Sequence, residues 1–313
     1  MEKICPRCGA RFECRHDSIE SCHCTSVRLS DEQRDYIARN YSGCLCHHCL
    51  ENITTEPHPV SVRELANFLL DLSRTLMGAG AHTSRVVRNV TRIAESFGYK
   101  VDMTIFQMHI TMTIRHAGDD TIRRTSVGKI GPAAFNFDII SQISSLSWEA
   151  HDEHLSFREL TEKYERIIRK PRISRWWVLV LVTAANACFC RLFGGDVPAM
   201  GLVAAATFVG FFVRQGMSTG HANHMAIFLI CSFIASLIAS AGFRFHLGTT
   251  PETALGTSVL FLIPGVPLIN SIFDLLEGHV LVGISRAVNA LILIVCIALG
   301  LSATLLILGL DTL

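Results

Sequence analysis

Several signatures are missing from this 313-residue sequence, and each absence narrows its possible functions. The formal net charge is only +1, so the sequence carries no basic footprint for nucleic acid. It has no P-loop, no nucleophile elbow and no HExxH motif. These absences argue against an ATP-driven pump acting alone, and we expect no enzyme. The first residues, MEKICPRCGA, also lack the apolar h-region of a secretory signal peptide.

The composition is uneven along the chain and predicts three parts. Residues 1–50 hold eight of the twelve cysteines, residues 60–170 are mixed, and residues 176–310 are almost continuously apolar. We therefore expect a multi-domain protein. It would have a small cysteine-rich zinc-binding head (1–53), a cytoplasmic α+β domain (60–170) and an α-helical membrane bundle (176–313).

The apolar part predicts about five membrane spans, because one span needs about 20 apolar residues. The expected spans are 176–193, 197–213, 222–241, 253–276 and 287–310. Five basic residues lie between Arg166 and Arg175, directly before the first span. Because basic residues mark the cytoplasmic side, we expect the N-terminus in the cytoplasm and the C-terminus outside.

The fourth predicted span is interrupted by Pro264, Gly265 and Pro267. Lipid offers no partner for a freed backbone, so such a break is tolerated only inside a bundle or beside a water-filled cavity. Broken helices of this kind form substrate sites in many transporters. The alternative is a kinked helix that only packs against its neighbours.

Polar residues close to this break are candidate transport residues. Asp274 follows Asn270 by four residues, so the two share a helical face. A carboxylate beside a substrate path could couple transport to protons. Arg214 and Arg286 could attract an anionic substrate at the cytoplasmic mouth, or could simply extend to the interface.

The middle part shows helix caps followed by strand periodicity. Ser61 and Ser156 each precede a Glu by three residues, which predicts two capped helices. Thr83 or Ser84 could cap another helix, and a fourth is expected near 133–147. Alternation with period two between residues 101 and 127 predicts strands. The glycine-rich stretch 78–84 could hold an anion at a helix start, or could be a plain helical corner.

The head holds eight thiols within 45 residues. Without an export signal it should lie in a reducing compartment, where thiolates favour zinc over disulfides. An iron–sulfur centre is a further alternative. Eight sulfurs suffice for two structural sites, although one zinc with spare thiols is also possible. The candidate ligands are Cys5, Cys8, Cys14, Cys22, Cys24, Cys44, Cys46 and Cys49.

The cysteine spacing, which ends in YSGCLCHHCL, resembles that of the bacterial cysteine-rich CWC domain. That family usually has Trp between the middle pair of cysteines, where this chain has His23. The resemblance implies metal binding.

The rest of the chain resembles the threonine/serine exporter (ThrE-like) family, and more closely its split form, the YjjP-type inner-membrane subunit. The motifs are LMGAGAHTSRVV at 76–87, PRISRWW at 171–177, ANACFCRLFGGD at 185–196 and IPGVPLINSIFDLLEGHVLVGISR at 263–286. The resemblance implies efflux of small carboxylate metabolites, namely threonine and serine for single-chain members and succinate for the two-subunit form. The implied transport motif, completed by Arg214 from the charge argument, is Pro264, Gly265, Pro267, Asn270, Asp274, Gly278, His279 and Arg286.

Single-chain members of the family carry a second block of spans that is not found before Leu313. The resemblance therefore implies a hetero-oligomer with a small YjjB-type membrane subunit in the bacterial inner membrane. A membrane-anchored sensor of metal or ligand is the alternative function. A hydrolase built around His82 and Ser84 is a third.

Overall fold

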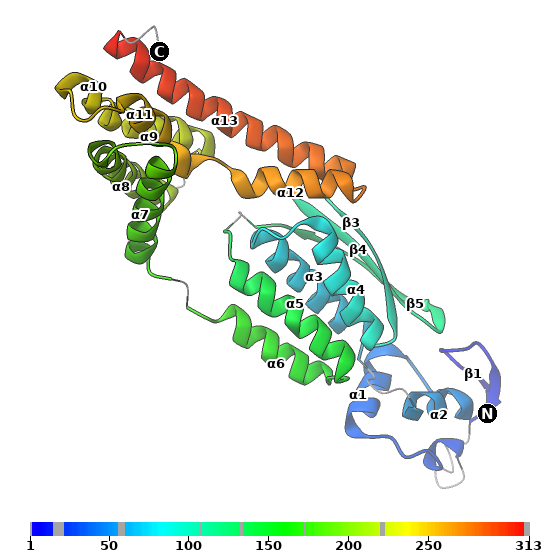
Figure 1. Ribbon diagram of the computed structural model, residues 1–313. Coiled ribbons are helices and arrows are strands. Elements are labelled where there is room, and N and C mark those ends of the chain that lie inside the picture. Colours follow the sequence, from blue (N-terminus) through cyan, green and yellow to red (C-terminus); the bar gives the residue numbers. More distant parts are fainter. Residues whose placement is uncertain are drawn as a thin grey trace. The chain divides into compact units, whose positions relative to one another are not determined.

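The computed structural model describes residues 2–14, 22–55, 60–106, 108–131, 134–171, 173–219 and 223–309 (Figure 1). It divides into two compact units, one of residues 1–170 with 273–283 and one of residues 171–272 with 284–313. The boundary between the units cuts the helix Gly265–Leu276 after Ile272. Positions 133, 222 and 310, where predicted elements begin or end, lie outside the described residues, as do positions 56–59 between the predicted head and the predicted α+β domain.

The head consists of a short hairpin and two helices. Strands β1 (Glu2–Ile4) and β2 (Arg11–Glu13) pair antiparallel, and η2 (His23–Thr25), α1 (Asp31–Asn40) and α2 (His47–Thr55) follow. Helix α1 begins with a capping box, in which Gln33 N donates to Ser30 Oγ at 3.2 Å and Ser30 N donates to Gln33 Oε1 at 2.9 Å. The apolar core is small and is formed mainly by Tyr36, Leu45, Leu50 and Ile53. So small a core needs further support, such as a metal.

The α+β domain is a three-stranded antiparallel sheet with helices packed on one face (Figure 1). Its elements are α3 (Val62–Gly78), α4 (Thr83–Ser96), β3 (Tyr99–Ile105), β4 (His109–His116), β5 (Asp119–Lys129), α5 (Phe137–Asp152) and α6 (Phe157–Ile168). Alternate residues of β4, Ile110, Met112 and Ile114, are fully buried in one core with Leu65 and Leu69 of α3. The predicted change from helical to strand periodicity is thus confirmed.

Most of the predicted caps in this domain are confirmed. Ser61 Oγ accepts from Glu64 N at 3.1 Å, and Ser156 forms a capping box with Glu159. Helix α5 begins at Phe137, four residues after the predicted start, because Asn136 caps it through Ile139 N. The prediction of Thr83 or Ser84 as a cap is wrong, since the N-cap of α4 is His82 and its side chain makes no capping hydrogen bond.

The second unit is built from apolar helices, two of which, α12 and α13, are shared with the first unit. They are α7 (Arg175–Leu192), α8 (Val197–Thr219), α9 (His224–Ala239), α10 (Ala241–Phe245), α11 (Pro251–Thr257), η3 (Leu260–Leu262), α12 (Gly265–Leu276) and α13 (Val280–Leu308). Among the described residues, four stretches are long and apolar enough to cross a membrane: Arg175–Leu192, Val197–Thr219, His224–Phe245 and Val280–Leu308. A fifth results if the bent pair Pro251–Leu262 and Gly265–Leu276 counts as one span. Helix α8 runs six residues beyond its predicted end at 213, and α13 starts seven residues before the predicted 287.

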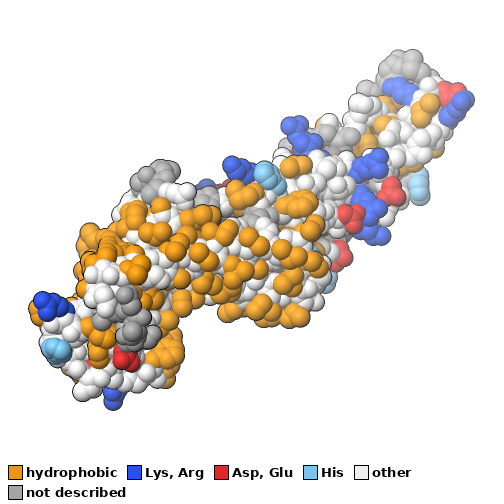
Figure 2. Space-filling view, turned by 90° about the horizontal axis from the view of Figure 1, so that it is seen from above, with side chains coloured by type: hydrophobic (Ala, Val, Ile, Leu, Met, Phe, Trp, Pro, Cys, Tyr) orange, Lys and Arg blue, Asp and Glu red, His pale blue; other side chains and the backbone are white. Residues whose placement is uncertain are grey.

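These helices expose apolar side chains and pair their polar groups internally. Figure 2 shows hydrophobic side chains crowding much of the visible surface, and Leu281, Leu306 and Ile307 are among those more than two-thirds exposed. Inside the second unit, Ser232 Oγ donates to Ile297 O at 2.7 Å. Gly300 lies so close to α9 that a Cβ there would come within 2.5 Å of Leu229 O. Exposed apolar faces and small residues at helix contacts are the pattern of a membrane protein.

Candidate functional site

The break in the fourth predicted span has a defined backbone geometry. Helix η3 ends at Leu262, α12 starts at Gly265, and the two segments meet at an angle of 62°. Gly265 N donates to Ile263 O at 2.8 Å, instead of to Phe261 O four residues back. Pro267 lies in the first turn of α12, where a missing N–H costs no helical hydrogen bond. The sequence thus leaves the Phe261 carbonyl without a helical hydrogen bond and starts α12 three residues after the end of η3.

The released carbonyl is taken up by Arg214 of α8. Arg214 Nη1 donates to Phe261 O at 3.3 Å, and the guanidinium lies over the Phe228 ring at 5.0 Å. A polar backbone group inside a membrane bundle needs such a partner, because lipid supplies none. Arg214 therefore supports the break directly, a role that its position near the end of a span did not reveal.

The last turn of α12 carries a fully buried carboxylate. Asp274 has no exposed surface, and its Oδ1 accepts a hydrogen bond from Thr83 N at 2.8 Å. Thr83 is the first residue of α4, where amides have no partner within the helix. A negative group is favoured at this end by the helix dipole. The anion at the glycine-rich corner is therefore a carboxylate of the chain itself.

A second carboxylate extends this contact. Glu277 Oε2 lies 3.3 Å from His82 Nδ1, and Glu277 Oε1 lies 3.6 Å from Arg88 Nη1. A hydrogen bond from the Ser84 side chain, aided by His82 and Arg88, lowers the pKa of Glu277. Burial lowers the pKa of His82, and the charge of Glu277 opposes that shift. The first two turns of α4 and its N-cap thus hold two carboxylates through backbone, imidazole and guanidinium groups.

Two glycines make this arrangement possible by ending helices. Gly278 has φ +87°, with Gly278 N bonded to Leu275 O and His279 N bonded to Asp274 O, which is a Schellman motif. Gly80 ends α3 in the same way, with φ +91° and Ala81 N bonded to Leu76 O. Gly278, predicted as part of the transport motif, therefore has a clear conformational role.

The remaining motif residues lie on α12 and α13 or directly beside these helices. Pro264 is buried before α12, Asn270 is half-buried on α12, His279 is half-buried after it, and Arg286 is half-buried on α13. Three contacts were not predicted from the sequence. They join Thr83 to Asp274, Arg88 to Glu277, and Phe261 to Arg214. The anion-binding potential of residues 78–84 was the one signal that pointed to Thr83.

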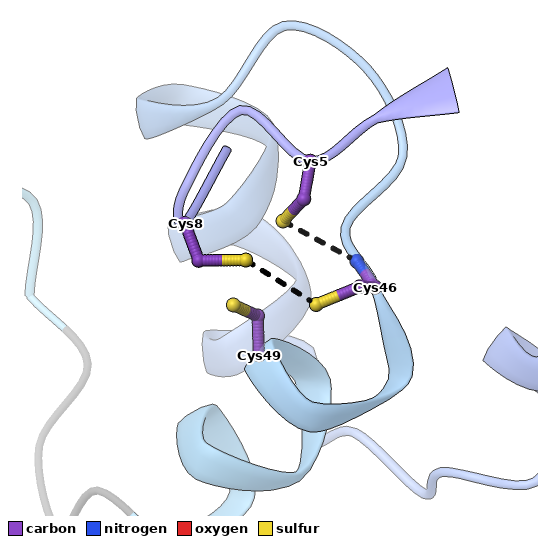
Figure 3. Close-up of side chains that lie close together, drawn as sticks. All are labelled: Cys5, Cys8, Cys46 and Cys49. Atoms are coloured by element: carbon purple, nitrogen blue, oxygen red, sulfur yellow. Dashed lines mark hydrogen bonds between the residues drawn. The ribbon is translucent and has the colours of Figure 1, made fainter. Parts of the chain in front are cut away.

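Four of the eight head cysteines come together, as Figure 3 shows. The sulfurs of Cys5, Cys8, Cys46 and Cys49 all lie within 4.8 Å of one another. Cys5 and Cys8 belong to the β1–β2 turn, while Cys46 and Cys49 lie at the start of α2. Within the described part of the chain this is the one such group of three or more ligating side chains. Both pairs have the spacing Cys-x-x-Cys, which is the sequence signal for this grouping.

The donor set fits a soft divalent metal. Tetrahedral zinc with four thiolates places its sulfurs about 3.8 Å apart, and Cys8 Sγ lies 3.6 Å from Cys46 Sγ. Burial disfavours the Cys5 thiolate, but N–H donors led by Cys46 N at 3.4 Å outweigh it and lower the pKa of Cys5 to about 6. Burial raises the pKa of Cys49. The cluster is thus compatible with metal binding.

The other four candidate ligands are less closely grouped. Cys14 Sγ lies 3.7 Å from Cys44 Sγ, and Lys3 Nζ lies 3.8 Å from the same Cys44 sulfur. Cys22 is buried and Cys24 is exposed. Their assignment as metal ligands stays a prediction.

Two family profiles match the chain. The profile of the ThrE family, described as "Putative threonine/serine exporter", matches residues 67–308. The cysteine-rich CWC profile matches residues 5–51. No solved structure matches significantly.

Curated relatives match over most of the chain. The "Probable succinate transporter subunit YjjP" of Klebsiella aerogenes is 26% identical over 248 residues, which cover 78% of this chain and 94% of that protein. The protein of the same name from Escherichia coli K12 is 26% identical, covering 79% and 96%. A "Probable threonine/serine exporter" of Mycobacterium tuberculosis H37Rv is 22% identical, over 78% of this chain and 46% of that protein.

Proposed function

Because this chain belongs to the ThrE family of exporters, we propose that it is a subunit of a secondary exporter for small carboxylate metabolites in the bacterial inner membrane. The observation that carries the proposal is the broken span, whose released carbonyl is held by Arg214. A stabilised break inside a membrane bundle is a device for a substrate path, and a plain anchor does not need it.

The proposed path uses the motif expected from the sequence. Arg286 attracts the anion at the cytoplasmic mouth, and the break at Pro264, Gly265 and Pro267, where Arg214 binds Phe261 O, receives it. Asn270 and Asp274 follow on the next turns of α12, and Gly278 and His279 form the turn into α13. The ion gradient drives export, with the Asp274 carboxylate as the candidate proton-coupling group.

The substrate proposal follows from the relatives. Two relatives are named succinate transporter subunits and one a threonine/serine exporter. These substrates share a carboxylate, so a succinate-like dicarboxylate or a hydroxy amino acid is the proposed cargo. The word "subunit" in two of the names supports a partner chain, which we propose to be a small YjjB-type membrane subunit. Basic residues 166–175 support a cytoplasmic N-terminus.

For the head we propose structural zinc held by Cys5, Cys8, Cys46 and Cys49. Four thiolates prefer zinc to magnesium or calcium, and a closed four-cysteine shell leaves no open coordination position. The metal would supply folding free energy to a domain whose own core is small.

Efflux from proteoliposomes tests the proposed function. Vesicles with this chain alone, and with its small partner, are loaded in parallel with labelled succinate and labelled threonine. We expect release of one label when both chains are present and a proton gradient is imposed. No release of either label under any gradient would contradict the exporter proposal.

The metal cluster favours one other candidate, a membrane-anchored sensor. In that case the head or the α+β domain binds a ligand and the helices only anchor it. Deletion of residues 1–55 separates the two functions, because a carrier keeps its efflux without the head. A signalling response that requires metal, without any efflux of substrate, would favour the sensor. A hydrolase has less support, because His82 and Ser84 both interact with Glu277.

A further inference from the structure

The contact between the broken span and the first turn of α4 extends the transport motif beyond the membrane helices. Three residues of the last turn and end of α12 meet α4. The Phe273 ring lies 5.8 Å from the His82 ring, Asp274 binds Thr83 N, and Glu277 faces His82 and Arg88. All of these residues belong to one compact unit. The end of the broken span is thus an integral part of the unit that contains the α+β domain.

The Asp274 contact takes the place of a missing cap. His82 is the N-cap residue of α4 but makes no capping bond with its side chain. The orphan amide of Thr83 is satisfied by Asp274 instead, inside a site where Thr83 is 1% exposed and Asp274 is fully buried. Removing either partner leaves the other without its observed hydrogen bond in a dry environment. The two groups therefore fix each other's position.

A tight turn joins α12 to α13, so a contact that fixes the end of α12 also fixes the start of α13. After the Schellman motif at Gly278, Gly283 packs directly on α12, since a Cβ there would meet Leu275 Cγ at 2.7 Å. Gly283 N also bonds to His279 O. Asp274 lies ten residues after Pro264, which is about 15 Å along the helix. The contact therefore acts at a distance from the break.

We propose that the start of α4, through the Thr83 N–H together with His82 and Arg88, is a positioning element of the transport apparatus that fixes the cytoplasmic end of the broken span. This inference rests on the proposed exporter function. Because the contact is remote from the break, it governs the conformational step of transport more than the binding of the carboxylate.

One substitution removes the key donor and leaves the helix intact. Thr83 is the first helical residue, where proline is tolerated, and His82 has φ −74° and ψ 155°, which suits a residue before proline. Thr83→Pro therefore deletes the N–H without breaking α4. Val62→Pro is the matched control at the first residue of α3. Ser61 there has φ −69° and ψ 138° and caps α3 through Glu64 N.

The test combines efflux with a double-mutant cycle on the full chain together with its partner subunit. Labelled succinate and threonine are the probes, and the variants are Thr83→Pro, Asp274→Leu, their combination and Val62→Pro. We expect Thr83→Pro and Asp274→Leu each to lower the maximal efflux rate about tenfold with KM changed less than about twofold, and the combination to lower it no further. Asp274→Asn keeps an acceptor oxygen for Thr83 N, so its melting temperature should lie closer to that of the wild type than the melting temperature of Asp274→Leu does. Val62→Pro should transport like the wild type.

Melting temperatures of the same variants in detergent show whether the two residues are coupled, independently of transport. Additive losses of melting temperature, or a Thr83→Pro variant that transports as fast as Val62→Pro, would overturn the inference while the exporter function stands. Absence of wild-type efflux for both probes would overturn the exporter function itself and this inference with it.

Discussion

Asp274 Oδ1 accepts a hydrogen bond from Thr83 N at 2.8 Å, although 191 positions separate the two residues in the chain. The carboxylate comes from the last turn of a broken apolar helix, and the amide comes from the first turn of a helix in the α+β domain. This contact links the last turn of α12 to the α+β domain, and Asp274 of the chain itself thus occupies the anion site that residues 78–84 could form.

His82 predicts a dependence of stability on pH. Burial lowers its pKa below 6.5, so the folded chain binds this proton less readily than the unfolded chain. The corresponding stability is present above pH 6.5 and is lost as the pH falls through the folded pKa. We expect His82→Gln to reduce the loss of melting temperature on acidification from neutral pH. Glu277→Gln removes the opposing charge and should enlarge that loss. His109→Gln, at an exposed position at the start of β4, should melt like the wild type at every pH. An unchanged pH profile for His82→Gln would refute this assignment.

Arg214 should be essential for the stability of the break. In Arg214→Met the carbonyl of Phe261 loses its partner, a loss that costs about 1–3 kcal/mol for a buried polar group. We expect a lower melting temperature in detergent and reduced efflux, with Arg214→Lys between the two because an ammonium can still donate. Arg244→Met, at an exposed position in α10, is the control and should leave both readouts unchanged. Equal melting temperatures and efflux rates for Arg214→Met and Arg244→Met would show that the break does not depend on Arg214.

Two neighbouring glycines should respond differently to alanine. Gly80 has φ +91°, and a Cβ there would come within 2.3 Å of the Phe135 ring. Gly80→Ala should therefore destabilise the chain by at least about 1–2 kcal/mol from the backbone conformation alone. Gly78 is helical, and a Cβ added there would have no neighbouring atom within 4 Å, so Gly78→Ala should be neutral or slightly stabilising. Thermal melting of the two variants in detergent measures the difference, and a similar loss in both would contradict the expected strain at Gly80.

The cysteine cluster predicts metal content. Cys46→Ser removes one of four grouped sulfurs and should lower the zinc content by one atom per chain, measured by elemental analysis of the purified protein. Residues 1–55 of that variant should also become sensitive to protease, because metal binding and folding are coupled. Cys188→Ser changes an exposed cysteine of α7 and should keep the wild-type zinc content. Unchanged zinc in Cys46→Ser would exclude this cluster as the metal site.

Local signals made much of the fold predictable. The caps at Ser61 and Ser156 were readable because each lies three residues before its partner. Likewise, the strand periodicity came from side chains that alternate between the core and the opposite face. The bounds of α8 and α13 were less accurate, because apolar helices continue through polar residues at their ends.

The site was only partly predictable, because its contacts are not local. Sequence reasoning placed the cap of α4 on Thr83 or Ser84, while the structure satisfies that amide with Asp274. The glycine-rich stretch at 78–84 indicated that an anion could bind there, but the sequence did not identify Asp274 as that anion. Similarly, the proline and glycine content revealed the break, but the pairing of Arg214 with Phe261 depends on how two helices pack. The head carried a stronger signal, since its eight cysteines predicted metal ligands, but which four sulfurs meet became clear only in the structure.

The proposed role of the break in the fourth predicted span is to receive the substrate. It is tested most directly by efflux from proteoliposomes with the variant Pro264→Ala, Gly265→Ala, Pro267→Ala, which favours a continuous helix. We expect this variant to insert and to assemble with its partner normally but to export labelled substrate at least about tenfold more slowly than the wild type. Export at the wild-type rate by the straightened span would contradict the claim.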